Sequence, residues 1–221
     1  MGIGRNAYDA TWGRAFAALY ERAMVKTEEA GMREHRRELV AGAAGRTVEL
    51  GAGTGLNFDH YPDAVTELVL TEPFEPMARR LRERASRPSP GGRTVEAVVI
   101  EAPADHLPLD DDSVDTAVST LVLCTVDDLP ATLMEIARVL RPGGRLLFAE
   151  HVRSAEPELA RWQDRLEVPW KLVGHGCRCN RDTVAAIEAS PLVVESVELG
   201  RLPKAAPIVR PLATGVAVKP T

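Results

Sequence analysis

Apolar positions recur every three or four residues through the first forty residues, which is the period of an amphipathic helix. One face of that helix would carry Phe16, Leu19, Tyr20, Ala23 and Met24. Gly31 is expected to divide the region, and the charged segment 32–39 after it is expected to lie half in solvent. The pattern therefore predicts a helical segment over residues 1–40, ahead of the main fold.

From residue 47 onward, short apolar runs alternate with helical periods. A helix is expected directly after the first strand, and Asn180 is expected to cap the last helix. The predicted strands are 47–50, 67–70, 95–100, 116–123, 145–150, 193–199 and 214–218, and the predicted helices are 76–84, 129–140 and 181–189. Alternation of this kind is typical of βαβ units. It predicts one α/β domain over residues 1–221, with a mainly parallel seven-stranded sheet and helices on both faces.

Composition narrows the class of protein. Of the 221 residues, 45% are hydrophobic and 27% are charged, which fits a single globular domain. The net charge of −5 argues against a protein that binds nucleic acid through a basic face. Apolar runs are shorter than the ~20 residues of a membrane helix, and no signal-peptide core follows Met1. Three cysteines fit a reducing compartment. We expect a cytoplasmic protein without an integral membrane segment, acting on a small molecule, as a monomer or a homodimer.

The most informative stretch is a glycine-rich loop after the first predicted strand. It begins at Glu49 and contains Gly51, Gly53 and Gly55, in the spacing G-x-G-x-G. Glycine accepts a positive φ and allows a ligand to approach the backbone closely. The spacing differs from the G-x-G-x-x-G of dinucleotide-binding proteins. Because ligands of such sheets bind at the carboxyl ends of the strands, we expect a nucleoside cofactor here.

Polar residues follow the neighbouring predicted strands at the same edge. Glu72 ends the second strand, 19 residues after Gly53, where a carboxylate can accept hydrogen bonds from ribose hydroxyls. Ala104 and Asp105 follow the third strand, where an adenine ring would lie. The fourth predicted strand runs into 120–122, which faces the glycine loop. Together these positions outline a cofactor site.

These motifs resemble those of the class I S-adenosylmethionine-dependent methyltransferases. The glycine loop is similar to the first motif of that family, 107–115 to its "LPF…D-x-S-F-D" stretch, and 138–144 to its "R-V-L-K-P-G-G" turn. Stretches 55–62, 120–126, 150–152 and 170–177 further resemble the alkyl-thiol S-methyltransferases of the methyltransferase-like group. Two features of this sequence differ from that group. Its members carry a hydrophobic N-terminal membrane anchor, which is not expected here, and they have an aspartate at the position of Glu72.

The resemblance implies the class I fold, S-adenosylmethionine as cofactor, S-adenosylhomocysteine as product, and methyl transfer to a small molecule, with a thiol as the best acceptor. Segment 8–24 would form a lid over the cofactor, within the N-terminal segment 1–40, and 151–180 would form an insertion at the acceptor site. The cofactor residues implied are Tyr20, Glu49, Gly51, Ala52, Gly53, Gly55, Asn57, Glu72, Pro73, Met77, Ala104, Asp105, Thr120, Leu121 and Val122.

Four residues are candidates for the acceptor side. His151 directly follows the fifth predicted strand, and an imidazole titrating near pH 6.5 suits a general base. Its alternative role is to tie a loop to the backbone. Cys124 ends the fourth predicted strand, as a wall of the acceptor site or as a buried apolar residue. The other two candidates are Trp170 and His175. Trp162 and Trp170 flank Pro169, and they either wall a hydrophobic pocket or pack in the core.

A metal site is not expected. The stretch 175–179 offers three soft ligands bunched together, whereas structural zinc takes four ligands from two pairs. The acidic run 110–112 is interpreted as a solvated loop.

Other functions remain open from the sequence. Nitrogen, oxygen or carbon of a small metabolite, or of a phospholipid headgroup, is the alternative methyl acceptor. An apolar pocket would favour a thiol, and carboxylates would favour a cationic amine. A dinucleotide-dependent oxidoreductase and a non-catalytic cofactor-binding subunit are alternatives from other classes.

Overall fold

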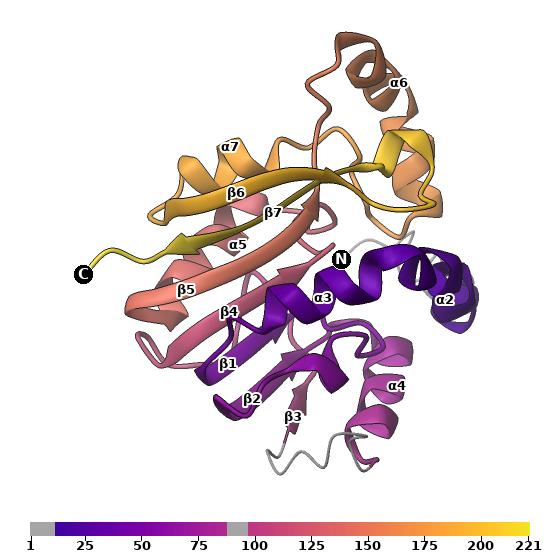
Figure 1. The fold of residues 1–221 in the computed structure, drawn as a ribbon. Coiled ribbons are helices and arrows are strands. Elements are labelled where there is room, and N and C mark those ends of the chain that lie inside the picture. Colours follow the sequence, from indigo (N-terminus) through magenta and orange to yellow (C-terminus); the bar gives the residue numbers. More distant parts are fainter. Residues whose placement is uncertain (1–11, 88–96) are drawn as a thin grey trace.

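A computed structural model describes residues 12–87 and 97–221 (Figure 1). The N-terminal segment forms α2 (Arg14–Thr27), a π-helical turn (Glu28–Met32) and α3 (Arg33–Val40). The remaining helices are α4 (Glu75–Ala85), α5 (Leu129–Val139), α6 (Pro157–Val173) and α7 (Thr183–Glu188), with 3₁₀ turns at Phe58–His60 and Pro207–Val209. The start of the expected lid, residues 8–11, most of the loop 87–92 and the first residues of the strand 95–100 lie outside the described part.

The sheet confirms the predicted architecture. Its seven strands are ordered β3-β2-β1-β4-β5-β7-β6. The strands are β1 (Gly45–Leu50), β2 (Val65–Thr71), β3 (Ala97–Ile100), β4 (Val114–Thr120), β5 (Leu140–His151), β6 (Val193–Arg201) and β7 (Pro211–Val218). The first five strands in chain order pair in parallel, and β7 lies antiparallel between β5 and β6. The sheet is therefore mainly parallel, with an antiparallel hairpin at one edge.

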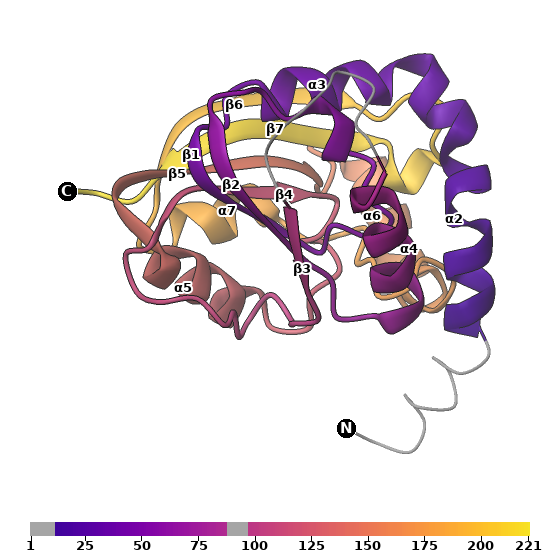
Figure 2. The same cartoon turned by 90° about the horizontal axis from the view of Figure 1, so that it is seen from below.

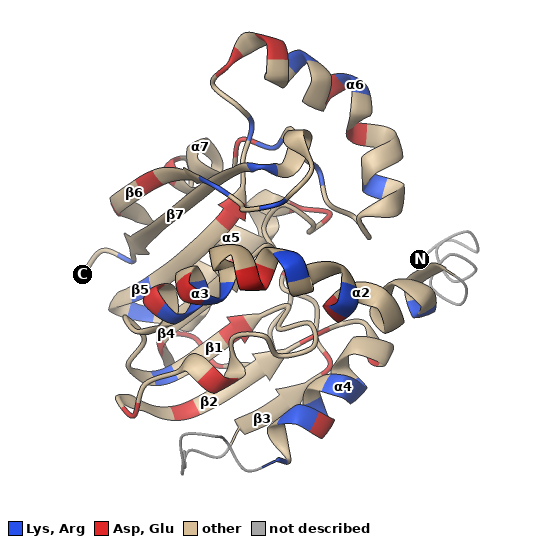
Figure 3. Cartoon of the chain, turned by 45° about the vertical axis from the view of Figure 1, so that its right-hand side comes forward, with Lys and Arg blue, Asp and Glu red and all other residues tan. Residues whose placement is uncertain are grey.

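Helices cover both faces of this sheet (Figure 2). On one face, α5 and α7 pack through residues such as Leu133 and Ile187 against Phe148 of β5. On the other, α3 and α4 pack through Val40 and Leu81 against neighbouring strand residues of the opposite pleat. The helix α6 contacts the 3₁₀ turn Pro207–Val209 ahead of β7, and it contains charged residues of both signs (Figures 1 and 3). The core is thus two apolar layers with the sheet between them.

The helix expected after the glycine loop does not form, and that prediction is wrong. Only the short 3₁₀ turn Phe58–His60 separates the loop from β2. Gly51, Gly53 and Gly55 have φ angles of 51°, 60° and 83°, so the chain turns back on itself instead of entering a right-handed helix. The turns are closed locally, as by the 2.8 Å bond from the Gly55 amide to the Ala52 carbonyl.

Several element boundaries also differ from the predictions. The fourth strand ends at Thr120 because Leu121 has a φ of 60°, which a strand cannot contain. The last helix begins at Thr183, where the Asp182 carboxylate caps it by accepting from the Ala185 amide at 3.1 Å. Asn180 therefore does not cap that helix. The long helix α6, which contains Pro169, was not predicted.

The N-terminal segment is divided as expected. Gly31, with a φ of 132°, breaks the helical path inside the π-helical turn. The segment 32–39 lies partly in solvent as expected: Met32, Arg36 and Leu39 are buried, together with the following Val40, whereas the residues between them are exposed. This stripe, at helical spacing, fixes α3 across the sheet.

Candidate functional site

The carboxyl ends of β1, β2, β4 and β5 meet at one edge of the sheet, and α2 runs past that edge (Figures 1 and 2). Strand order reverses between β1 and β4, so this edge contains the topological switch point of the sheet. Open α/β sheets bind ligands at such a point. Glu49, Glu72 and Thr120 lie at or just after the ends of three of these strands.

The glycine loop, residues 51–55, follows β1, and we refer to it as the cradle. A Cβ atom added at Gly51 would lie 2.9 Å from Val122, and one at Gly55 would lie 2.8 Å from Leu81, so these two glycines are required by packing. A Cβ at Gly53 would meet nothing nearer than the Gly51 carbonyl at 3.9 Å. The Thr54 hydroxyl is buried and has no hydrogen-bond partner in the described structure. The loop thus has free space at Gly53 and an unused polar group beside it, as a bound polar ligand requires.

Glu72 lies at the end of β2 and touches this cradle. One carboxylate oxygen accepts from the Gly53 amide at 2.9 Å, and the other accepts from the Phe74 amide at 2.9 Å. Burial raises the pKa of Glu72 to about 7, against the effect of the two amides. The carboxylate is therefore held in a fixed orientation, with lone pairs left to accept ligand hydroxyls.

A buried polar network lies behind the loop. The Asn57 amide donates to Glu49 and to the Thr120 hydroxyl, both at 3.0 Å. The Tyr61 hydroxyl donates to the second Glu49 oxygen at 2.7 Å. Burial raises the pKa of Glu49 to about 7, and these donors oppose it. The network joins β1, the loop and β4 into one unit.

This network extends to the N-terminal segment through a residue that the sequence interpretation missed. The buried Arg36 side chain donates to Glu28 and to the Asn57 carbonyl oxygen, both at 3.0 Å. A signal was present, because Arg36 falls on the same helical stripe as Met32 and Val40. A single arginine on an apolar stripe indicates a buried partner.

Glu150 is a second residue without an assigned role in the sequence interpretation. It ends β5 next to His151 and accepts from the Ser119 hydroxyl at 2.7 Å. It also accepts from the backbone amides of Val122 at 3.0 Å and Cys124 at 3.2 Å. The pKa of Glu150 is raised by burial, although these hydrogen bonds act in the opposite direction. The carboxylate thereby holds the turn that follows β4, including the unusual backbone of Leu121.

Tyr20 of α2 is half-buried, with its ring against that of Phe16. Burial raises the pKa of Tyr20, and the groups that act on it electrostatically are Arg36, Glu28, Cys124 and Glu72. These groups come from the N-terminal segment, the end of β2 and the turn after β4. The position of Tyr20 among them is consistent with the expected contact between α2 and the cofactor site.

Aromatic rings close the outer side of the site. The His175 ring lies 5.1 Å from that of Phe16 and 4.8 Å from that of Phe74, centroid to centroid. The Trp12 indole donates to the Val173 carbonyl at 3.3 Å. Segment 12–16 of the expected lid therefore meets segment 173–175 of the expected insertion over the end of β2.

The remaining acceptor-side candidates are in different surroundings. His151 is buried, and burial lowers its pKa to about 4 against the effect of the Val209 and Pro211 backbones. An imidazole with this pKa is neutral at physiological pH but only weakly basic, and the low basicity weakens its interpretation as a general base. Cys124 and Trp170 belong to one small apolar cluster. Trp162 is 48% exposed on α6, so it does not wall the site.

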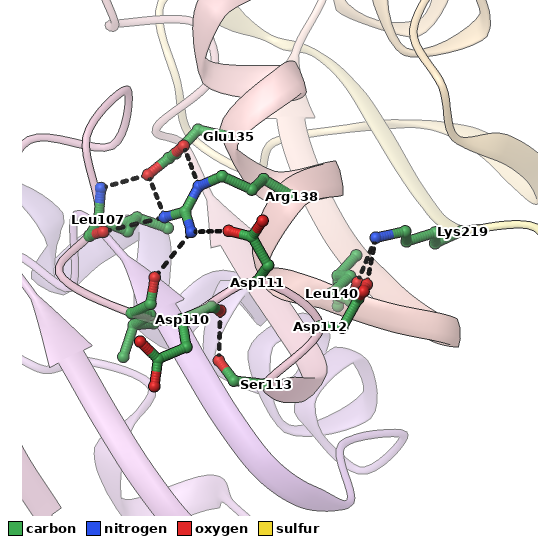
Figure 4. A network of polar contacts seen from close by, with 10 residues as sticks. Leu107, Asp110, Asp111, Asp112, Ser113, Glu135, Arg138, Leu140 and Lys219 are labelled. Carbon is green, nitrogen blue, oxygen red and sulfur yellow. Dashed lines mark hydrogen bonds and ion pairs between the residues drawn. The ribbon is translucent and has the colours of Figure 1, made fainter.

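On the opposite side of the site, Met77 and Ala104 are buried, whereas Pro73 and Asp105 are exposed. The loop that follows Asp105 is fixed to α5 by Arg138, which donates to Glu135 and to the carbonyls of Leu107 and Leu109 (Figure 4). This network keeps the loop in place beside the end of β3.

The acidic run 110–112 is exposed and lies in a loop, in agreement with its interpretation as a solvated loop, and two of its carboxylates form surface ion pairs. Arg138 pairs with Asp111 at 2.6 Å, and Lys219 pairs with Asp112 at 2.6 Å (Figure 4). Within residues 12–87 and 97–221, no group of three or more potential metal ligands comes together. In the same ranges, no helix is both long and apolar enough to span a membrane.

Known proteins resemble this chain in sequence and in structure. The family model described as "Methyltransferase domain" matches residues 48–148. Human thiol S-methyltransferase TMT1B is 37% identical over 169 residues, covering 71% of this chain and 67% of that protein. Human thiol S-methyltransferase TMT1A is 34% identical over 186 residues, covering 81% and 73%.

Solved structures support the same assignment at the level of the fold. A methyltransferase from Thermotoga maritima, described as a possible histamine N-methyltransferase, superposes with a TM-score of 0.67 at 23% identity, covering 95% of this chain and 98% of that one. Geranyl diphosphate C-methyltransferase from Streptomyces coelicolor, in complex with S-adenosyl-L-homocysteine, superposes with a TM-score of 0.62 at 15% identity, covering 86% and 80%. This chain belongs to the class I S-adenosylmethionine-dependent methyltransferases.

Proposed function

We propose that this methyltransferase acts on a small, uncharged thiol and produces a thioether. The observation that carries the proposal is the state of the buried carboxylates at the site. Glu28, Glu49 and Glu150 each accept hydrogen bonds from donors of the chain itself, and Glu72, which also accepts from the chain, is assigned below to the cofactor ribose. A cationic amine would need a carboxylate free to pair with it. The site therefore favours a neutral acceptor.

The outer wall of the site supports the same acceptor class. The rings of Phe16, Phe74 and His175 meet there, and Trp170 lies close by in the cluster around Cys124. Apolar and aromatic walls stabilise an apolar ligand and exclude water from the reacting groups. The 34–37% identity to thiol S-methyltransferases agrees with this inference.

The geometry of the cradle supports the following assignment of cofactor residues. When bound, S-adenosylmethionine supplies a methyl group on a positively charged sulfur. We infer that Glu72 accepts the ribose hydroxyls, and that the Gly53 backbone allows the methionine part to approach. Thr54 would supply its unused hydroxyl, and Thr120 with Tyr20 would border the same space. Met77 and Ala104 would border the adenine.

The main contribution of the protein to this reaction is alignment. Transfer to a thiol requires the thiolate, and a free thiol has a pKa of ~8.5. A neutral His151 with its pKa lowered to about 4 supplies little driving force for proton removal. We infer that the thiol loses its proton to solvent before it is enclosed, and that the site then holds the acceptor sulfur in line with the methyl group.

An initial-rate assay tests the proposal. Purified protein and S-adenosylmethionine are incubated with alkyl thiols, amines or phenols of matched size, and products are identified by mass. The expected result is a thioether formed by wild type, and formed more slowly by Glu72→Gln when S-adenosylmethionine is limiting. Failure of every thiol, while S-adenosylhomocysteine still binds, would refute the thiol acceptor.

A further inference from the structure

Two buried cysteines that the proposed reaction does not use lie against each other. The sulfur atoms of Cys124 and Cys177 are 3.9 Å apart. Cys124 comes from the turn after β4, whereas Cys177 comes from the loop between α6 and α7, 53 residues away. Both are reduced thiols, and Cys177 keeps 7% of its surface exposed while Cys124 keeps none.

The backbones of the two segments are fixed in register. The Arg178 amide donates to the Cys124 carbonyl at 2.8 Å. The Arg181 guanidinium donates to the carbonyls of Leu123 at 2.6 Å and Val126 at 2.8 Å. A disulfide requires a sulfur separation of ~2.05 Å, so the atoms need to approach by only about 1.9 Å. Side-chain rotation accounts for much of such a movement while these backbone bonds remain.

The two thiols are chemically unequal. Contact with the Cys124 thiol and the Trp170 indole lowers the pKa of Cys177, and the Arg181 charge acts in the same direction. Contact with Cys177 and burial raise the pKa of Cys124. Burial raises the pKa of the third cysteine, Cys179, to about 11. A more acidic thiol beside a less acidic one is the arrangement of a nucleophile with its resolving partner.

We propose that Cys124 and Cys177 form a reversible disulfide in response to hydrogen peroxide, a modification site that joins the turn after β4 to the loop before α7. The Cys177 thiolate attacks one peroxide oxygen, breaks the O–O bond and becomes a sulfenic acid, with hydroxide leaving. The Cys124 sulfur then attacks the Cys177 sulfur, and hydroxide leaves and is protonated. Two thiols and one peroxide thus become one disulfide and two waters. A dithiol reductant reverses the bond by exchange.

Tryptic digestion and mass spectrometry can identify this disulfide in the wild-type protein, because each cysteine lies in a different tryptic peptide. Trypsin cleaves after Arg178, which separates Cys177 in peptide 172–178 from Cys179 in peptide 179–181. Cys124 lies in peptide 94–138. The full-length protein is reduced, freed of reductant, treated with hydrogen peroxide, and then unfolded in N-ethylmaleimide before digestion. We expect peptide 94–138 linked to peptide 172–178, a maleimide on Cys179, and loss of the link after dithiothreitol.

Variants provide the matched control. Cys179→Ser is expected to form the same link, whereas Cys177→Ser is expected to form none. A link to Cys179, or a Cys177 oxidised to sulfinic acid beside a maleimide-labelled Cys124, would overturn the proposal. So would three maleimides on the wild-type protein after peroxide. The readout is covalent, so its failure is separate from any failure of the thiol methyltransferase assay.

Discussion

The Arg36 guanidinium donates a hydrogen bond to the Asn57 side-chain carbonyl at 3.0 Å, and both side chains are buried. Arg36 belongs to α3, and Asn57 closes the glycine loop. The Asn57 side-chain amide in turn donates hydrogen bonds to Glu49 and to the Thr120 hydroxyl. The N-terminal segment is thereby joined to the cofactor cradle through one amide side chain.

Replacing Asn57 tests this connection. Asn57→Ala is expected to lower the free energy of unfolding by about 2–4 kcal/mol, because it leaves Arg36 and Glu49 with unsatisfied buried groups. Urea denaturation without cofactor measures the loss. Asn180→Ala removes only a partly exposed hydrogen bond to Asp164 and is the control, expected to change stability by about 0.5 kcal/mol or less. Equal effects of the two variants would contradict the role given to Asn57.

Glu72 is expected to make cofactor binding dependent on pH. Its pKa in the free protein is raised to about 7, and hydroxyl donors favour the charged form, so binding releases a proton. Affinity for S-adenosylhomocysteine should therefore rise with pH through about 7 and level off above it. Glu72→Gln should weaken binding by about tenfold to a hundredfold, as loss of charged hydrogen bonds does, and flatten this dependence.

Calorimetry between pH 6 and pH 8 measures both effects. The exposed Glu75→Gln is the control on the same segment and should bind as wild type does. Glu49 also has its pKa raised to about 7, so Glu49→Gln is compared in parallel. An unchanged pH dependence in Glu72→Gln would remove Glu72 from the ribose site.

Two glycines of the cradle are expected to respond differently to alanine. Gly55→Ala should destabilise the fold by about 3 kcal/mol, since the added methyl lies 2.8 Å from Leu81 and φ is positive. Gly53→Ala meets free space and should cost about 1 kcal/mol of backbone strain. Its larger effect should be on S-adenosylhomocysteine, with affinity lowered at least about tenfold. Normal affinity in Gly53→Ala would show that the ligand does not fill this space.

His151 is expected to matter for stability and not for proton transfer. Its pKa is lowered from 6.5 to about 4 in the folded chain, so the unfolded chain binds more protons between these values. The stabilisation from the neutral side chain is present above pH 6.5 and is lost as the pH falls toward 4. His151→Gln should reduce that pH dependence of unfolding, whereas the exposed His106→Gln should not.

Turnover provides the second half of this test. With no proton taken by His151, kcat/KM should rise with pH through the pKa of the acceptor thiol, in parallel for wild type and His151→Gln. A pH–rate profile that loses an acidic limb only in the variant would restore His151 as the general base.

The sequence predicted those features that depend on local spacing. Glu72 was selected because a carboxylate at the end of the second strand has a defined distance from the glycine loop, and it accepts from the Gly53 amide of that loop. Glu150 and Arg36 received no role because their partners come from other elements, which spacing along the chain does not reveal. The missing helix after the loop has a local cause, since consecutive turns with positive φ prevent helix entry. Asp182 replaced Asn180 as the helix cap because both are good caps and Asn180 pairs with Asp164 instead.

The central claim is thiol methylation, and a competition assay tests it most directly. Wild-type protein receives S-adenosylmethionine with a trideuterated methyl group, together with an alkyl thiol, the amine and the alcohol of the same chain length, at equal concentration. Mass spectrometry of one mixture gives the ratio of kcat/KM values for the three acceptors. The account predicts the trideuteromethyl thioether as the dominant product. Faster methylation of the amine or the alcohol would contradict it.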